Sequence, residues 1–164
     1  MVVIVVVMGV SGSGKTTVGR AVARRLNVTF LDADEFHSPR NVERMRRGEA
    51  LTDEDRAPWL HALRARLDEA DRMGESVVLA CSALKHAYRE QLHAPSVRFA
   101  FLRVPEALLR ERLASRRGHF AGPSFLAGQL ATLEEPSEQE AIVVRVEASD
   151  DPDALAERIV EALR

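Results

Sequence analysis

Residues 9–16, GVSGSGKT, restrict what this chain can fold into more than any other feature of its sequence. They match the pattern G-x-x-x-x-G-K-[ST], whose glycines let the backbone curl so that successive N–H groups point inward at phosphate oxygens. An unbroken apolar run at residues 2–8 precedes the motif, and Val18, Val22 and Leu26 follow it at helical spacing. A glycine-rich turn that only joins a strand to a helix is the alternative. Because phosphate binding requires this setting of strand, turn and helix, we expect a nucleotide site.

The same motif assigns roles to individual residues. The Lys15 amine would reach the β- and γ-phosphates of ATP, and the Thr16 hydroxyl would bind Mg²⁺. We therefore expect ATP and Mg²⁺ as cofactors. The residues expected to bind the nucleotide are Gly9, Val10, Ser11, Gly12, Ser13, Gly14, Lys15, Thr16 and Thr17.

Strand-like and helix-like segments alternate through the rest of the chain. After the first strand, apolar and β-branched runs predict strands at residues 28–31, 76–81, 97–104 and 141–146. Helical patterns lie between them, including one expected to begin at Pro58 and a closing one that begins at Pro152. We predict one α/β domain over residues 1–164, with a five-stranded parallel sheet and helices on both faces.

Composition excludes several classes of function. The formal charge of −2 gives no basic field for a nucleic-acid partner. Cys81 is the only cysteine, so an internal disulfide is impossible, which suits a reducing compartment. The apolar run at residues 2–8 is too short to span a bilayer, and it has neither a basic region before it nor a cleavage site after it. We therefore expect a cytoplasmic protein without a membrane partner.

The metal-side carboxylate cannot come from the third strand, which ends in Cys81 and Ser82. Asp32 and Asp34 follow the second strand and are two residues apart, so in extended backbone their side chains would share one face. At the carboxyl edge of a parallel sheet, that face looks into the ligand crevice. We expect Asp32 to hold Mg²⁺ through water and Asp34 to accept the proton of a substrate hydroxyl. A role in a turn or a helix cap is the alternative for both.

With these motifs the chain resembles the gluconate kinases, which are P-loop kinases of the shikimate-kinase-like and nucleoside-monophosphate-kinase superfamily. The strings D-x-D-R-x-P-W-L and C-S-A-L-K-x-x-Y-R separate it from shikimate and adenylate kinases. One departure is Thr16, where many members have serine. The resemblance covers nearly the whole chain and rests on residues 8–15, residues 31–34 with His37 and Asn41, Met45 with Gly48, residues 51–60, residues 80–85 with Tyr88 and Arg89, residues 117–120, and Gln129 with residues 132–134.

The resemblance implies conversion of gluconate to 6-phosphogluconate with ATP and Mg²⁺, and a homodimer. Gluconate is a polyol with one carboxylate, which Arg56 or Arg89 could grip with two parallel hydrogen bonds, and Lys85 as a point charge. Each of these residues could instead be a surface or structural group, and Trp59 is expected in the core. The side chains expected to bond the hydroxyls are those of His37, Asn41, Ser82 and Gln129, with segment 35–58 supplying much of the substrate site.

Three arginines stand near a segment that contains two glycines and little apolar content, for which we expect a mobile loop. By resemblance, Arg112 would stack on adenine, whereas Arg116 and Arg117 would belong to a lid at about residues 116–124 and reach the transferring phosphoryl group. A solvated helix face is the alternative for such a run. Two other functions stay open: a kinase for shikimate or a nucleotide, and a non-catalytic module that responds to nucleotide.

Overall fold

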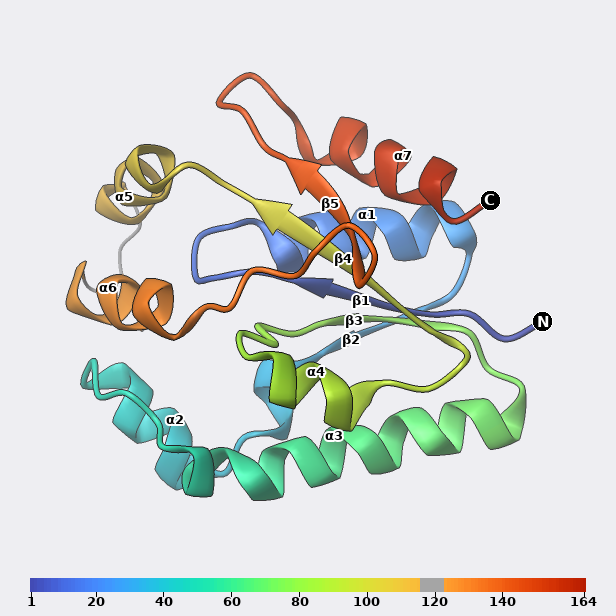
Figure 1. The fold of residues 1–164 in the computed structure, drawn as a ribbon, viewed down its shortest axis with the longest axis horizontal. Coiled ribbons are helices and arrows are strands. Elements are labelled where there is room, and N and C mark those ends of the chain that lie inside the picture. The colour runs from blue at the N-terminus through green and yellow to red at the C-terminus, as the bar shows by residue number, and fades with distance from the viewer. Residues whose placement is uncertain (116–122) are drawn as a thin grey trace.

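The computed structural model of the chain describes residues 1–115 and 123–164, and the side chains of all of these except residues 123 and 124. The described residues form a five-stranded sheet in the order β2-β3-β1-β4-β5, and every neighbouring pair is parallel. Figure 1 shows the strands running side by side toward one edge of the molecule. The prediction of a parallel five-stranded α/β domain is confirmed. The strands are β1 (Ile4–Met8), β2 (Thr29–Asp32), β3 (Val77–Ala80), β4 (Val97–Arg103) and β5 (Ala141–Arg145).

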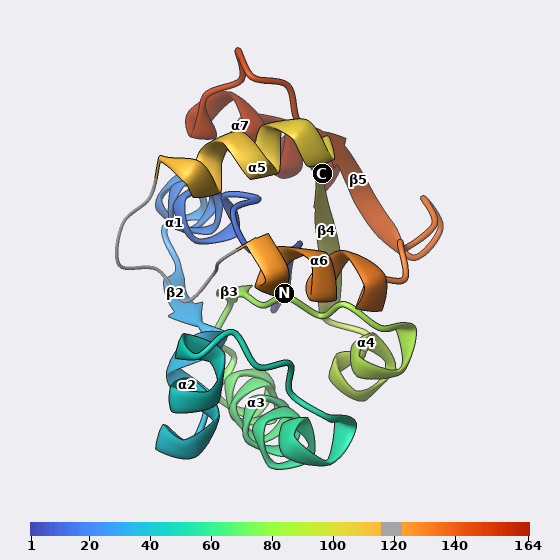
Figure 2. The ribbon, with the colours of Figure 1, turned by 90° about the vertical axis from the view of Figure 1, so that its left-hand side faces the viewer.

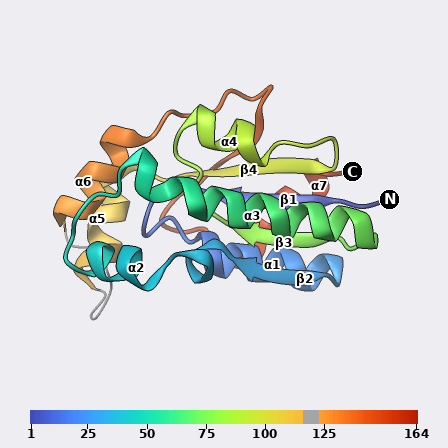
Figure 3. The same cartoon turned by 90° about the horizontal axis from the view of Figure 1, so that it is seen from below.

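Helices cover both faces of the sheet, as Figures 1 and 3 show. One face carries α1 (Lys15–Leu26) and α7 (Pro152–Ala162), and the other carries α3 (Asp53–Met73) and α4 (His86–Leu92). Alternate residues of β1 pack into the two layers: Ile4, Val6 and Met8 with α3, and Val5 and Val7 with α1. This double burial explains why the strand is apolar at every position. It leaves the ends of the strands, and not the faces of the sheet, as the place for a ligand.

The remaining helices lie beyond the carboxyl ends of the strands (Figure 2). A short 3-10 helix, η1 (Ala33–Phe36), and α2 (Pro39–Arg46) follow β2, whereas α5 (Glu106–Ala114) and α6 (Pro123–Thr132) follow β4. Val10 of the P-loop packs with buried leucines of α5 and α6. No helix in the described ranges has the length and apolar character needed to cross a membrane.

One helix boundary differs from the prediction. α3 begins at Asp53 instead of Pro58, because Thr52 and Asp55 form a capping box in which each side chain accepts a hydrogen bond from the other residue's backbone N–H. Pro58 therefore lies inside the helix. The earlier start places Arg56 on a helix whose N-terminal turns lie beside the carboxyl edge of the sheet (Figure 1).

Candidate active site

A cavity of about 500 Å³ lies at the carboxyl edge of the sheet, where the P-loop meets η1, α3 and α6. Its wall combines residues from five separate parts of the described chain. Most side chains expected to act on ligands are among them. The predicted site residues that line the cavity are Ser11, Gly12, Gly14, Lys15, Thr16, Thr17, Asp32, Asp34, His37, Arg56, Ser82 and Gln129.

The P-loop is held in shape by its glycines and by neighbours outside the cavity. Gly12 and Gly14 have φ angles of 83° and 92°, which side chains other than glycine rarely adopt. Gly14 caps α1 without a side chain, so the positive end of the helix faces the phosphate site. Gly9 and Val10, also expected to bind nucleotide, do not line the cavity; Val10 is instead buried in an apolar cluster. Val10 therefore anchors the loop to the apolar core beside α5 and α6.

Two further contacts hold the P-loop. The Arg112 guanidinium donates hydrogen bonds to the backbone carbonyls of Gly12 and Ser13, at 3.0 and 3.3 Å. The Ser13 side chain is buried. The expected stacking of Arg112 on adenine stays a prediction, and the geometry gives this arginine a role in bracing the loop.

Two carboxylates line the cavity together with Lys15. Asp32 ends β2 and caps η1, where its Oδ1 accepts the N–H of Asp34 at 3.0 Å. The extended geometry expected for the pair is therefore wrong, but both side chains line the same cavity. Burial raises the pKa of Asp32, the Asp34 charge adds to that effect, and Lys15 opposes it.

Oxygen ligands suited to magnesium line this cavity. The Thr16 hydroxyl and the Asp32 carboxylate belong to different elements and line the same cavity as Lys15. Hard oxygen donors are the ligands that Mg²⁺ takes. A cation would lower the pKa of Asp32 and so oppose the effects of burial and of the Asp34 charge. The residues present therefore fit the metal.

An aromatic pair forms another part of the wall. The His37 ring stacks on Trp59 with 4.3 Å between centroids and 11° between planes. Trp59 donates its indole N–H to the Ala33 carbonyl at 2.7 Å and is 3% exposed, so its expected place in the core is confirmed. Burial and the charge of Arg56 lower the pKa of His37 to about 4. The imidazole is therefore neutral near pH 7 and has both a donor and an acceptor nitrogen.

Arg56 and Gln129 enter the cavity from opposite helices. Arg56 of α3 donates from Nη1 to the Tyr88 hydroxyl at 3.0 Å. Gln129 of α6 accepts the backbone N–H of Ser11 at 2.5 Å. Arg56 thus lines the cavity and contacts Tyr88, whereas Gln129 contacts the P-loop.

Three residues expected to bind substrate do not line the cavity: Asn41, Lys85 and Arg89. Asn41 is buried and donates to the Asp55 carbonyl at 2.9 Å. Lys85 donates to the Asp53 carboxylate at 3.1 Å. For these two residues the structure shows partners within the chain.

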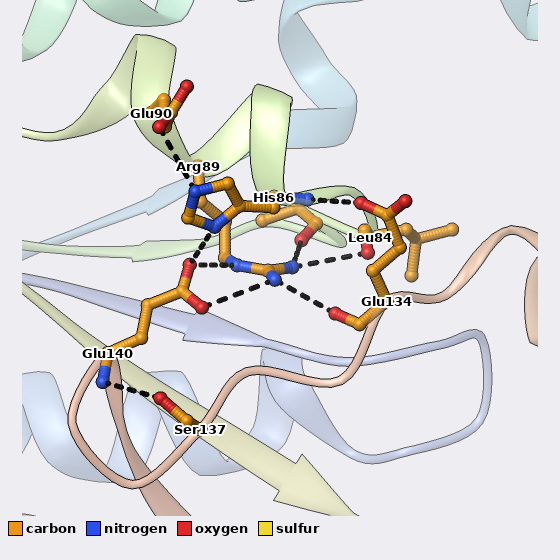
Figure 4. Close-up of polar contacts among 8 residues, drawn as sticks. Leu84, His86, Arg89, Glu90, Glu134, Ser137 and Glu140 are labelled. Atoms are coloured by element: carbon orange, nitrogen blue, oxygen red, sulfur yellow. Dashed lines mark hydrogen bonds and ion pairs between the residues drawn. The ribbon is translucent and has the colours of Figure 1, made fainter.

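The expected grip of Arg89 on the substrate disagrees with the structure more strongly. Arg89 is 2% exposed, and Figure 4 shows its guanidinium enclosed by protein groups. It donates to Glu140 and to the backbone carbonyls of Ala83, Leu84 and Glu134. All five N–H donors of the guanidinium are thereby used. The arginine joins the β3–α4 turn to the segment after α6. Arg116 and Arg117 lie outside the described residues.

Apolar wall residues were not predicted. Met45, Leu51 and Phe125 line the cavity beside the polar groups. Only Met45 and Leu51 belonged to strings that carried the resemblance, and no polar chemistry marked any of the three in the sequence. They add apolar surface to the wall of the cavity.

A P-loop between a buried strand and a helix, facing two carboxylates at the edge of a parallel sheet, defines a P-loop kinase. A family model described as an AAA domain matches residues 4–136. The chain is 46% identical to the gluconokinase of Gluconobacter oxydans, and the match covers 94% of this chain and 88% of that protein. The chain belongs to the gluconokinase family. Two solved structures are similar. A sugar kinase from Janibacter sp. has 44% sequence identity and a TM-score of 0.91, and the match covers 99% of this chain and 95% of that one. A gluconokinase from Sinorhizobium meliloti has 42% sequence identity and a TM-score of 0.80, and the match covers 98% of this chain and 95% of that one.

Proposed function

We propose that the protein transfers the γ-phosphoryl group of ATP to the terminal hydroxyl of D-gluconate, giving 6-phospho-D-gluconate and ADP. One observation carries the proposal: a single cavity brings Lys15 of the P-loop together with Asp34 and Arg56. Lys15 supplies a cation for the phosphates, and Asp34 supplies a base for the alcohol. Arg56 supplies paired hydrogen-bond donors for the carboxylate. Membership of the gluconokinase family supports the same substrate.

The transfer is in-line. The backbone amides of the P-loop and the Lys15 amine hold the phosphates. Asp34 orients the attacking hydroxyl and takes its proton as the new O–P bond forms. The bond from the γ-phosphorus to the bridging oxygen breaks, and ADP leaves with that oxygen. Positioning and electrostatic stabilisation supply most of the rate enhancement.

Magnesium would be held by Thr16 and, through water, by Asp32. The ion offsets negative charge on the phosphates when it is bound. The support for these two ligands is that both residues line the same cavity as Lys15.

The other half of the cavity takes the sugar acid. Arg56 binds the carboxylate, and neutral His37 and Ser82 bond the hydroxyls of the chain. Segment 35–58 supplies two of these three residues. The lid at about residues 116–124, the homodimer and the cytoplasmic location stay predictions.

An acceptor panel tests the function. ADP release would be followed for the wild type with gluconate, related sugar acids, shikimate and nucleoside monophosphates, and the gluconate product identified by phosphorus NMR. We expect turnover with gluconate far above that with shikimate or nucleotides. Robust phosphorylation of another acceptor in its place would refute the substrate, and inactivity on every acceptor would favour a non-catalytic module.

A further inference from the structure

Tyr88 contacts the substrate arginine from outside the cavity. Its hydroxyl accepts the Arg56 Nη1–H at 3.0 Å, and its ring centre lies 5.4 Å from the guanidinium carbon. Tyr88 is 4% exposed and is not among the cavity-lining residues. It comes from α4, whereas Arg56 comes from α3. A rigid, buried group of one helix therefore contacts the flexible side chain of the other.

A third group orients the proton of the Tyr88 hydroxyl. The Tyr88 hydroxyl donates its own proton to the Asp53 carboxylate, so a lone pair remains to accept from Arg56. Lys85 also donates to Asp53, to Oδ1 at 3.1 Å and to Oδ2 at 3.3 Å. Hydrogen bonds from Tyr88 and Lys85 lower the pKa of Asp53, which keeps this carboxylate ionised. Asp53, Tyr88 and Arg56 thus form an oriented chain of hydrogen bonds.

The charges of the cluster leave Arg56 available to an anion. Two cations, Arg56 and Lys85, accompany one carboxylate, and it is Lys85 that forms the ion pair with Asp53. Among the contacts of the described residues, Arg56 has no carboxylate partner within ion-pair distance. Arginine loses considerable side-chain freedom when it is fixed in one conformation. Contact with a buried phenol removes part of that freedom before a ligand arrives, which favours two-point binding of a carboxylate.

We propose that Tyr88 is a positioning residue, which orients Arg56 so that the guanidinium meets the carboxylate of the substrate, while Asp53 and Lys85 fix the direction of the Tyr88 hydroxyl. The inference rests on the proposed function, because it concerns the same substrate.

The Tyr88→Phe variant tests the inference, because it keeps the buried ring and removes only the hydroxyl. We expect KM for gluconate to rise about tenfold, which is typical for a lost hydrogen bond to a charged group. The kcat at saturating gluconate and KM for ATP should stay within about twofold of the wild type. Asp53→Ala acts on the same chain from the exposed side and should raise KM for gluconate in the same direction.

A double-mutant cycle separates positioning from a general structural role. In an Arg56→Met background, Tyr88→Phe should add little further loss in kcat/KM for gluconate, because Tyr88 acts through Arg56. In an Arg64→Met background it should keep its full effect, since Arg64 lies on the same helix but contacts the Leu92 carbonyl and Asp68. Melting temperatures of all variants would be measured beside the kinetics.

The outcomes are distinguishable. If the wild type turns over gluconate but the losses from Tyr88→Phe and Arg56→Met simply add, the positioning role is overturned and the proposed function stands. An equal rise in KM for ATP would also overturn it. If the wild type does not phosphorylate gluconate, the proposed function fails and the inference fails with it.

Discussion

The side-chain carbonyl of Gln129 accepts the backbone N–H of Ser11, and 2.5 Å separates the two atoms. Ser11 belongs to the loop whose N–H groups serve phosphate, whereas Gln129 lies on α6, 118 residues later in the chain. The contact joins the P-loop directly to the helix across the cavity. The uncharged Gln129 oxygen therefore accepts from the Ser11 N–H, a group that is expected to donate to phosphate.

A negative charge at position 129 should weaken the binding of ATP. We expect Gln129→Glu to raise KM for ATP by about tenfold or more, because a carboxylate beside Ser11 repels phosphate. Initial rates with each substrate varied in turn would measure this effect. Gln139→Glu is the matched control, since Gln139 is exposed and lies outside the cavity. A rise in KM for gluconate alone would instead support the role that the sequence suggested for Gln129.

Asp34 should matter for the transfer and not for ATP binding. We expect Asp34→Asn to lower kcat by about 10²- to 10⁴-fold, the usual range for loss of a general base. Its Kd for ATP, measured by calorimetry, should stay near that of the wild type. Glu35→Gln removes the adjacent carboxylate, which is exposed and does not line the cavity, and should leave kcat unchanged. Full turnover by Asp34→Asn would show that another group takes the proton.

The Thr16 hydroxyl should determine the response to magnesium. Thr16→Ser keeps the hydroxyl, so we expect near-normal rates, whereas Thr16→Val should lower kcat at least about tenfold and raise the Mg²⁺ concentration needed for half-maximal rate. Titration of each variant with Mg²⁺ at saturating ATP would measure both effects. Identical magnesium curves for the valine and serine variants would contradict the assignment.

His37 should make stability depend on pH. Its pKa is about 4 in the folded protein against 6.5 for the unperturbed group, because burial and Arg56 disfavour the imidazolium. The unfolded chain therefore binds the proton more tightly, and the free energy of unfolding should fall as the pH drops from 6.5 toward 4. The part due to His37 would be about 3 kcal/mol at most.

Urea titrations across this pH range would test the contribution of His37. His37→Gln should reduce the slope of unfolding free energy against pH. His61→Gln, at an exposed position of α3, should keep the wild-type slope. A His37 variant with an unaltered slope would show that other groups cause the pH dependence.

Arg89 should contribute to stability more than to binding. We expect Arg89→Met to destabilise the fold by about 3–5 kcal/mol, because it leaves buried carbonyls and Glu140 without their donor. Arg89→Lys should recover little, since an ammonium lacks the planar fork of donors. Arg98→Met, at an exposed position of β4, is the control and should change stability by less than about 0.5 kcal/mol. A stable Arg89→Met protein with a raised KM for gluconate would restore the sequence expectation.

The sheet could be predicted because a parallel strand covered on both faces is apolar at every position, as β1 is. The beginning of α3 could also have been found in the sequence, since Thr52 and Asp55 have the spacing of a capping box. Pro58, a residue favoured in the first turn of a helix, predicted a later start. Both results depend on short-range patterns, which a single sequence contains in full.

Strand ends made part of the site predictable from the chain's own pattern, whereas Arg56, His37 and Gln129 were expected from the family resemblance. Lys15 and Asp34 follow strands whose carboxyl ends share one edge, so their common cavity was expected. Arg89 was misassigned because its partner Glu140 is 51 residues away and no local pattern connects them. The contact between Gln129 and Ser11 was missed for the same reason.

Trp59 is the only tryptophan in the sequence, and it is stacked on His37 at the wall of the cavity. Indole fluorescence is sensitive to its immediate surroundings, and here those surroundings are a neutral imidazole and the space where the sugar acid would bind. The protein thus carries an intrinsic optical reporter at the wall of its cavity. If gluconate binds as proposed, we expect its addition to change the Trp59 emission, without a label and without turnover.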